Sequence, residues 1–134
     1  MVELDVVGKK GIKMISTLFQ VLEMRFEDTT ELQRQLLAAF SFGMLTKMSQ
    51  VKKLPIEQAY QNSRSMLIDV FHYGEDQAFE FTSFLIDVAS ERSVHSTIHV
   101  VINRGMLGYV QLMENKNLEL KNNIEEILNE VAKG

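Results

Sequence analysis

One uncharged stretch in the first half of the chain limits what the protein can fold into. Residues 36–45 read LLAAFSFGML, ten consecutive positions without a charged side chain. As a helix this run would be about 15 Å long, half of the roughly 30 Å hydrocarbon core of a bilayer, which excludes a membrane span. A helix that is apolar all round needs protein on every side. The run therefore predicts a central buried helix with other elements packed around it.

Apolar residues at helical spacing recur along nearly the whole chain, so we expect the surrounding elements to be helices too. Residues 27–30 offer an N-cap, Pro55 suits a first turn, Gly74 suits a helix end and Ser93 offers a further N-cap. The expected helices span about residues 12–25, 31–50, 55–74, 75–90, 93–113 and 118–132. A chain of 134 residues holds one core. We predict an all-α, single-domain bundle of five or six helices with short connections, over residues 1–134.

Two segments leave the type of element open. Residues 94–102 are rich in β-branched side chains, so a strand is an alternative to the start of the fifth helix. Residues 2–10 fit a short strand, an earlier helical turn or a loose arm. An N-terminal arm of this kind would cover residues 1–11.

The composition excludes several classes of protein. Without cysteine there is no disulfide framework, thiol nucleophile or zinc–thiolate site. The sequence also lacks a G-x-S-x-G, a P-loop and a G-x-G-x-x-G motif, so we predict no catalytic residues and no cofactor. Glu3 and Asp5 stand where a signal peptide needs basic residues, which favours a cytoplasmic protein.

The three histidines are the remaining candidates for metal or acid–base chemistry. His95 and His99 are four residues apart, the spacing of two metal ligands on one helix face, but no cysteine or intervening glutamate completes the set. His72 is close in sequence to Glu75 and Asp76, and a His–carboxylate pair can do acid–base work. A cation near a helix C-terminus is the simpler interpretation of His72. We therefore predict no metal site.

Three glycines interrupt predicted helices at Gly43, Gly105 and Gly108. Each should cost up to about 1 kcal/mol relative to alanine in a helix. Close approach of two helices over the missing side chains is the expected compensation, and a kink is the alternative.

The net charge of −4 is unevenly distributed. Residues 55–91, the acidic segment, contain seven carboxylates and one basic residue, Arg64, which gives −6. This charge disfavours nucleic acid and anionic membranes as partners. It favours a basic protein partner, or serves solubility alone.

The acidic segment predicts a partner-binding face on the third and fourth helices. We expect it to consist of Asp69, His72, Asp76, Glu80, Phe84 and Asp87. At helical spacing Phe84 falls beside Glu80 and Asp87, so the aromatic ring would anchor a basic partner while the carboxylates steer it. The alternative is a solvated face with one large hydrophobic residue packed under a loop.

Three segments, in order, resemble one protein family. They read FSFGML at residues 40–45, SMLIDVF at residues 65–71 and RGMLGY at residues 104–109. Together they resemble the immunity protein 48 family of bacterial polymorphic toxin systems, over roughly residues 32–131. The resemblance implies a small, all-α, cytoplasmic protein without cofactor or catalytic residues. Such a protein would bind and neutralise a cognate toxin encoded beside it, and a basic toxin would fit the acidic face.

Two other functions stay open on the sequence alone. A helical scaffold or adaptor would self-associate or dock another protein, and outward apolar residues such as Ile68 and Leu107 would fit a homodimer contact. An enzyme or metal protein would use His72, His95 and His99.

Overall fold

The computed structural model describes the backbone of residues 6–133 and the side chains of residues 9–131. Within this part the chain forms six α-helices, two short 3-10 helices and no β-strand, which confirms the all-α prediction. The α-helices are α1 (Val6–Val21), α2 (Glu31–Val51), α3 (Ile56–Asp69), α4 (Glu75–Ser90), α5 (Ser96–Met113) and α6 (Asn117–Lys133). The 3-10 helices are η1 (Phe26–Asp28) and η2 (Arg92–Val94). None of the helices described is long and apolar enough to cross a membrane.

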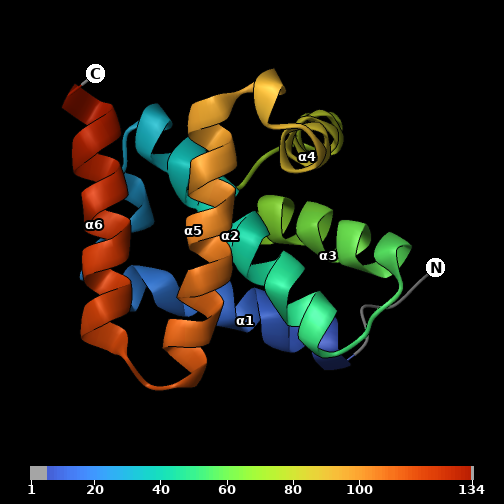
Figure 1. Cartoon of the computed structure of the whole chain (residues 1–134), viewed down its shortest axis with the longest axis horizontal. Coiled ribbons are helices and arrows are strands. Elements are labelled where there is room, and N and C mark those ends of the chain that lie inside the picture. The colour runs from blue at the N-terminus through green and yellow to red at the C-terminus, as the bar shows by residue number, and fades with distance from the viewer. Residues whose placement is uncertain (1–5, 134) are drawn as a thin grey trace.

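α2 is the central helix of the bundle. Every side chain of residues 36–45 is buried, so the prediction from the uncharged run is confirmed. α1, α3, α5 and α6 all pack against α2, and α4 packs against α3 and α5. In Figure 1, α5 crosses in front of α2, α6 runs antiparallel beside α5, and α4 is seen nearly end-on at the upper right.

α2 and α5 approach each other so closely that their backbones touch. Gly43 of α2 faces the carbonyl group of Ile102 in α5, and a Cβ at Gly43 would overlap that oxygen. Gly105 of α5 faces the carbonyl group of Phe40 in α2 in the same way. Gly108 leaves room for the Phe40 ring, whose Cζ would lie 2.5 Å from an added Cβ. The predicted close approach of helices over these glycines is therefore confirmed.

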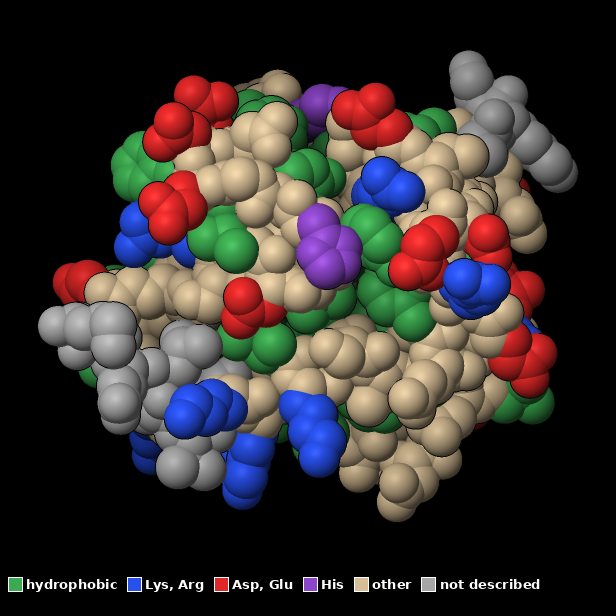
Figure 2. Space-filling view, turned by 180° about the vertical axis from the view of Figure 1, so that it is seen from behind, with side chains coloured by type: hydrophobic (Ala, Val, Ile, Leu, Met, Phe, Trp, Pro, Cys, Tyr) green, Lys and Arg blue, Asp and Glu red, His purple; other side chains and the backbone are tan. Residues whose placement is uncertain are grey.

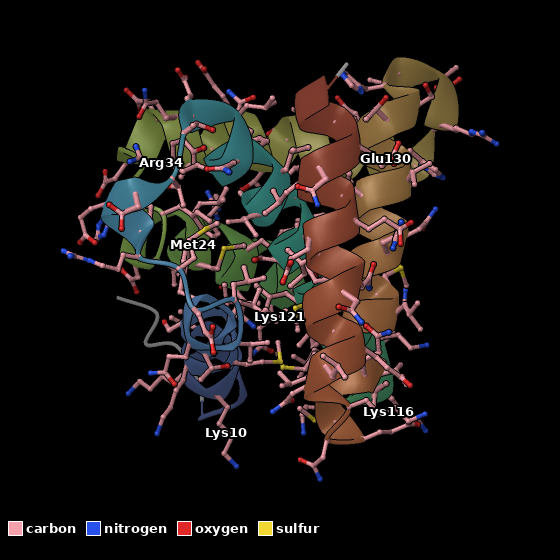
Figure 3. The ribbon with its side chains drawn as sticks, turned by 90° about the vertical axis from the view of Figure 1, so that its left-hand side faces the viewer. Lys10, Met24, Arg34, Lys116, Lys121 and Glu130 are labelled. Carbon is pink, nitrogen blue, oxygen red and sulfur yellow. The ribbon has the colours of Figure 1, made fainter. Side chains whose placement is uncertain are left out.

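A polar network joins α5 to α6, which lie side by side in Figure 3. The Asn123 side chain of α6 is buried, and its Oδ1 accepts a hydrogen bond from Arg104 Nε at 2.7 Å. Asn123 Nδ2 donates to the Arg104 carbonyl oxygen at 3.2 Å and to Gln111 Oε1 at 3.1 Å. Arg104 also forms an ion pair with Glu126 at 3.0 Å. The buried side-chain amide of Asn123 thus links α6 to two positions of α5, Arg104 and Gln111, that lie two turns apart.

The start of α2 follows the sequence signal, whereas α1 differs from its prediction. Thr30 caps α2, because its hydroxyl accepts the Gln33 N–H while the Gln33 side chain accepts the Thr30 N–H. α1 begins at Val6, so residues 6–11 belong to the helix and not to an arm, and it ends at Val21 rather than near residue 25. Residues 1–5 lie outside the described residues.

α3 ends at Asp69, earlier than predicted, and Gly74 is instead the N-cap of α4. His72 adopts the left-handed conformation (φ 60°) in the connection between the two helices. Left-handed residues that are not glycine also follow the ends of α1, α2 and α5, at Glu23, Lys53 and Asn115. The prediction that Gly74 ends this helix was wrong. Glycine adopts the left-handed conformation most easily, but here non-glycine residues adopt it after the helix ends.

α5 begins at Ser96, so the strand alternative for residues 94–102 is wrong. Ser93 lies in η2 and does not cap α5. His95 is the N-cap, and its Nδ1 accepts the backbone N–H of Ile98 at 3.2 Å. The imidazole thus replaces the oxygen that usually satisfies the first turn of a helix.

This cap gives a first testable prediction. We expect His95→Ala to lower the free energy of unfolding by about 1 kcal/mol, because the Ile98 N–H loses its acceptor. His95→Asp keeps an acceptor at the same place and should stay close to the parent. Urea unfolding followed by circular dichroism measures both variants. Equal losses in the two would contradict a capping role.

Candidate functional site

All six residues of the predicted partner-binding face lie exposed along α3, α4 and the connection between them. Asp69 is the last residue of α3 and His72 lies in the connection, while the other four lie on α4. Asp76, Glu80 and Asp87 share one side of α4 and span about 16 Å along its axis. The spacing therefore brings these three carboxylates into one ridge.

The charge of the acidic segment is not neutralised by neighbouring side chains. Among the described residues, no ion pair involves a carboxylate of residues 55–91, and all seven of these residues are exposed. Arg64 instead stacks on the Phe79 ring, with its guanidinium carbon 5.6 Å from the ring centre. In Figure 2 acidic side chains predominate at the upper left, the side where α4 lies, and lysine and arginine follow the lower edge.

His72 has contacts of its own at the α3 end of the face. Its ring meets the Phe26 ring edge-on, with 4.7 Å between centroids. The guanidinium of Arg34, labelled near the start of α2 in Figure 3, lies 4.5 Å from the centre of the same Phe26 ring. Phe26 of η1 therefore contacts His72 directly and Arg34 of α2 contacts Phe26, while the His72 side chain remains exposed.

A groove beside the acidic ridge is the feature that sequence reasoning missed. It has a volume of about 630 Å³ and is lined by residues of α2, α4, α5 and α6 and of the connections next to α4. One wall, the aromatic wall, is a row of four rings, each in contact with the next. The rings are Tyr73, Phe81, Phe84 and His95, with centroid distances of 5.5, 6.4 and 6.1 Å along the row. The facing wall is aliphatic and consists of Leu32, Leu36, Ile98 and Val131.

Glu80 gives this groove its charge. Among the described residues that line the groove, it is the one carboxylate, and none of these residues is a lysine or arginine. Burial raises the pKa of the Tyr73 phenol, nearby Glu31 adds to the rise and Arg34 opposes it, so the phenol is uncharged at neutral pH. The groove thus combines apolar walls with a single negative charge.

Phe84 joins the predicted face to the groove. Its side chain is 36% exposed and contacts the rings of Phe81 and His95. The sequence placed Phe84 beside Glu80 but gave no sign of the groove, since residues as distant as Leu32 and Val131 meet there. The three-residue spacing of Phe81 and Phe84 is the one sequence signal that could have indicated two neighbouring rings on one helix side.

The two histidines at metal-ligand spacing serve other purposes in the structure. His95 Nδ1 accepts the Ile98 N–H, and His99 Nδ1 lies 2.9 Å from the carbonyl oxygen of Val88. No group of three or more histidine, cysteine, aspartate or glutamate residues could hold a metal ion within the described part of the chain.

Comparison with known proteins identifies the family. The model of the family Immunity protein 48 matches residues 7–132, which is nearly the whole chain and agrees with the resemblance of its three segments. No curated protein and no solved structure matches the chain. A match of this length shows the family, and the family's name implies a toxin as the partner. The chain therefore belongs to the immunity protein 48 family.

Proposed function

We propose that this protein acts in the cytoplasm as a non-catalytic inhibitor of a toxin encoded beside it. The outer face of α3 and α4 would make the contact and mask the toxin's active site. The observation that carries the proposal is the exposed charge of the acidic segment, in which seven carboxylates stand against Arg64 alone. A toxin with a basic surface would neutralise this charge on binding.

Opposite charges on two partners mainly speed their encounter. A strong field of one sign can raise association rates about 10- to 1,000-fold at low salt. Fast capture suits an inhibitor that must reach its toxin before the toxin acts. The carboxylates of the ridge would therefore contribute rate and selectivity, and affinity would come from a few buried anchors.

The first test uses the genes on both sides of this one. A modular reading frame that ends in a compact basic domain is the expected neighbour. Expression of that domain alone should stop growth, and co-expression with this protein should restore it. A toxin whose effect this protein does not relieve would contradict the proposal, and so would neighbours without any toxin-like frame.

Charge reversal tests the face itself. We expect Asp69→Lys with Asp87→Lys to slow association with the toxin by about 10-fold or more at low salt. Both positions lie in the last turn of a helix, where the dipole favours a cation, so the pair should not unfold the protein. Stopped-flow or surface-plasmon kinetics measure the rate. Glu27→Lys with Glu114→Lys makes the same change in net charge elsewhere, and an equal effect of this control would move the site away from α3 and α4.

The alternative function, a self-associating scaffold or adaptor, has one observation in its favour. Leu107 of α5 is 51% exposed and would suit a homodimer contact. Ile68 packs against the core and therefore does not suit such a contact. Sedimentation over a range of concentrations tests this alternative, which requires a concentration-dependent rise in mass.

A further inference from the structure

We propose that the groove between the aromatic and aliphatic walls is the anchor site for the toxin. It would take one large apolar side chain of the toxin, with a lysine or arginine next to it meeting Glu80. This inference rests on the proposed function and names the chemistry that the partner must bring to the site.

Both lips of the groove are large hydrophobic residues that are left exposed. Leu32 on the α2 side is 43% exposed and Phe84 on the α4 side is 36% exposed. A side chain inserted between them would remove apolar surface from water on both sides. The volume of about 630 Å³ lies within the range of clefts that enclose small ligands, so the groove has room for a short segment of partner chain.

The charge around the groove selects a cation next to this apolar anchor. Glu80 precedes Phe84 by one helical turn, so a group seated on Phe84 has the carboxylate within reach. The Nδ1 atom of His95 accepts a backbone N–H. The described lining has one carboxylate and no lysine or arginine, so it favours a lysine or arginine of the partner, while an acidic segment would meet like charge.

The same charges argue against a second copy of this chain as the occupant. Two copies docked through this face would bring two acidic segments of −6 together. Like charges across an interface cost affinity. A basic partner relieves the repulsion that a second copy would create.

Two phenylalanines of α4 provide a matched pair for the experiment. Phe84 lies on the groove lip, whereas Phe79 is more exposed, at 57%, and lies in a separate depression beside Arg64. With the purified toxin domain as probe, we expect Phe84→Ala to weaken binding by about 30-fold or more and Phe79→Ala by less than about fivefold. Glu80→Gln should weaken binding and flatten its dependence on salt. Isothermal titration measures the affinities, and circular dichroism checks that each variant is folded.

Photo-crosslinking identifies what enters the groove. p-Benzoylphenylalanine at position 84 should cross-link to a toxin peptide with a large apolar residue beside lysine or arginine, and the same group at position 79 should not. If the toxin binds but Phe84→Ala and Phe79→Ala have equal effects, or only position 79 cross-links, this inference is overturned while the proposed function stands. A cross-link from position 84 to a second copy would also overturn it. If the neighbouring toxin does not bind at all, both proposals fail.

Discussion

Replacing Gly43 or Gly105 with alanine is expected to destabilise the protein by about 3 kcal/mol or more, the upper end of overpacking costs. A Cβ at Gly43 would overlap the Ile102 carbonyl oxygen, and a Cβ at Gly105 would overlap that of Phe40. Both obstacles are backbone atoms of a facing helix, so relief requires α2 and α5 to separate along their contact. Small domains have only about 5–15 kcal/mol of stability in total. The double variant should therefore be largely unfolded, which urea titration and circular dichroism at 222 nm would show.

Alanine at two other glycines is expected to cost less stability than at Gly43 and Gly105. A Cβ at Gly108 would press on the Phe40 ring, a side chain that can shift only with the core around it, so Gly108→Ala should give an intermediate loss. At Gly11 the obstacles are the terminal atoms of Leu45 and Met48, both at 2.8 Å and both flexible. Gly11→Ala should be close to neutral, since alanine favours the helix by up to about 1 kcal/mol. Similar losses at all four glycines would contradict the backbone-contact explanation.

Asn123→Ala is expected to lower the free energy of unfolding by about 2–4 kcal/mol. The Asn123 side chain makes three hydrogen bonds to α5, each worth about 1 kcal/mol. Removal of this side chain leaves a small cavity, and polar groups of Gln111 and Arg104 lose a partner. The loss should appear as a lower urea midpoint with an unchanged slope, because the same surface is exposed on unfolding.

The neighbouring residue of the same type provides the control. Asn122 is exposed on α6, so Asn122→Ala should change stability by less than about 0.5 kcal/mol. If Asn122→Ala and Asn123→Ala have the same effect, helix propensity and not the α5–α6 network decides the outcome.

Much of the fold could be predicted because it depends on local patterns. The uncharged run at residues 36–45 requires burial wherever it lies, and Thr30 with Gln33 caps α2 through contacts within one turn. The helix ends were harder to predict. His72 takes a left-handed conformation that few residues other than glycine adopt, and its ring packs against Phe26, a tertiary contact that local sequence patterns do not show.

In the candidate site, too, local patterns could be predicted from the sequence and tertiary contacts could not. Helical spacing alone places Asp76, Glu80 and Asp87 on one ridge of α4, and counting charges identifies the acidic segment. The groove beside that ridge could not be predicted, since its walls come from residues that lie far apart in the sequence and meet only when four helices pack.

Periodicity, hydrophobicity and charge are properties of the chain, so the helices, the central position of α2 and the sign of the charge on one face could be predicted from the residues. What the glycines and the aromatic residues contact became visible only in the packed fold. Gly43 and Gly105 matter through backbone contacts between two helices, and the role proposed for Phe84 depends on the groove beside it. Both depend on distances between elements, which are set when the core packs at high density and every side chain finds its neighbours.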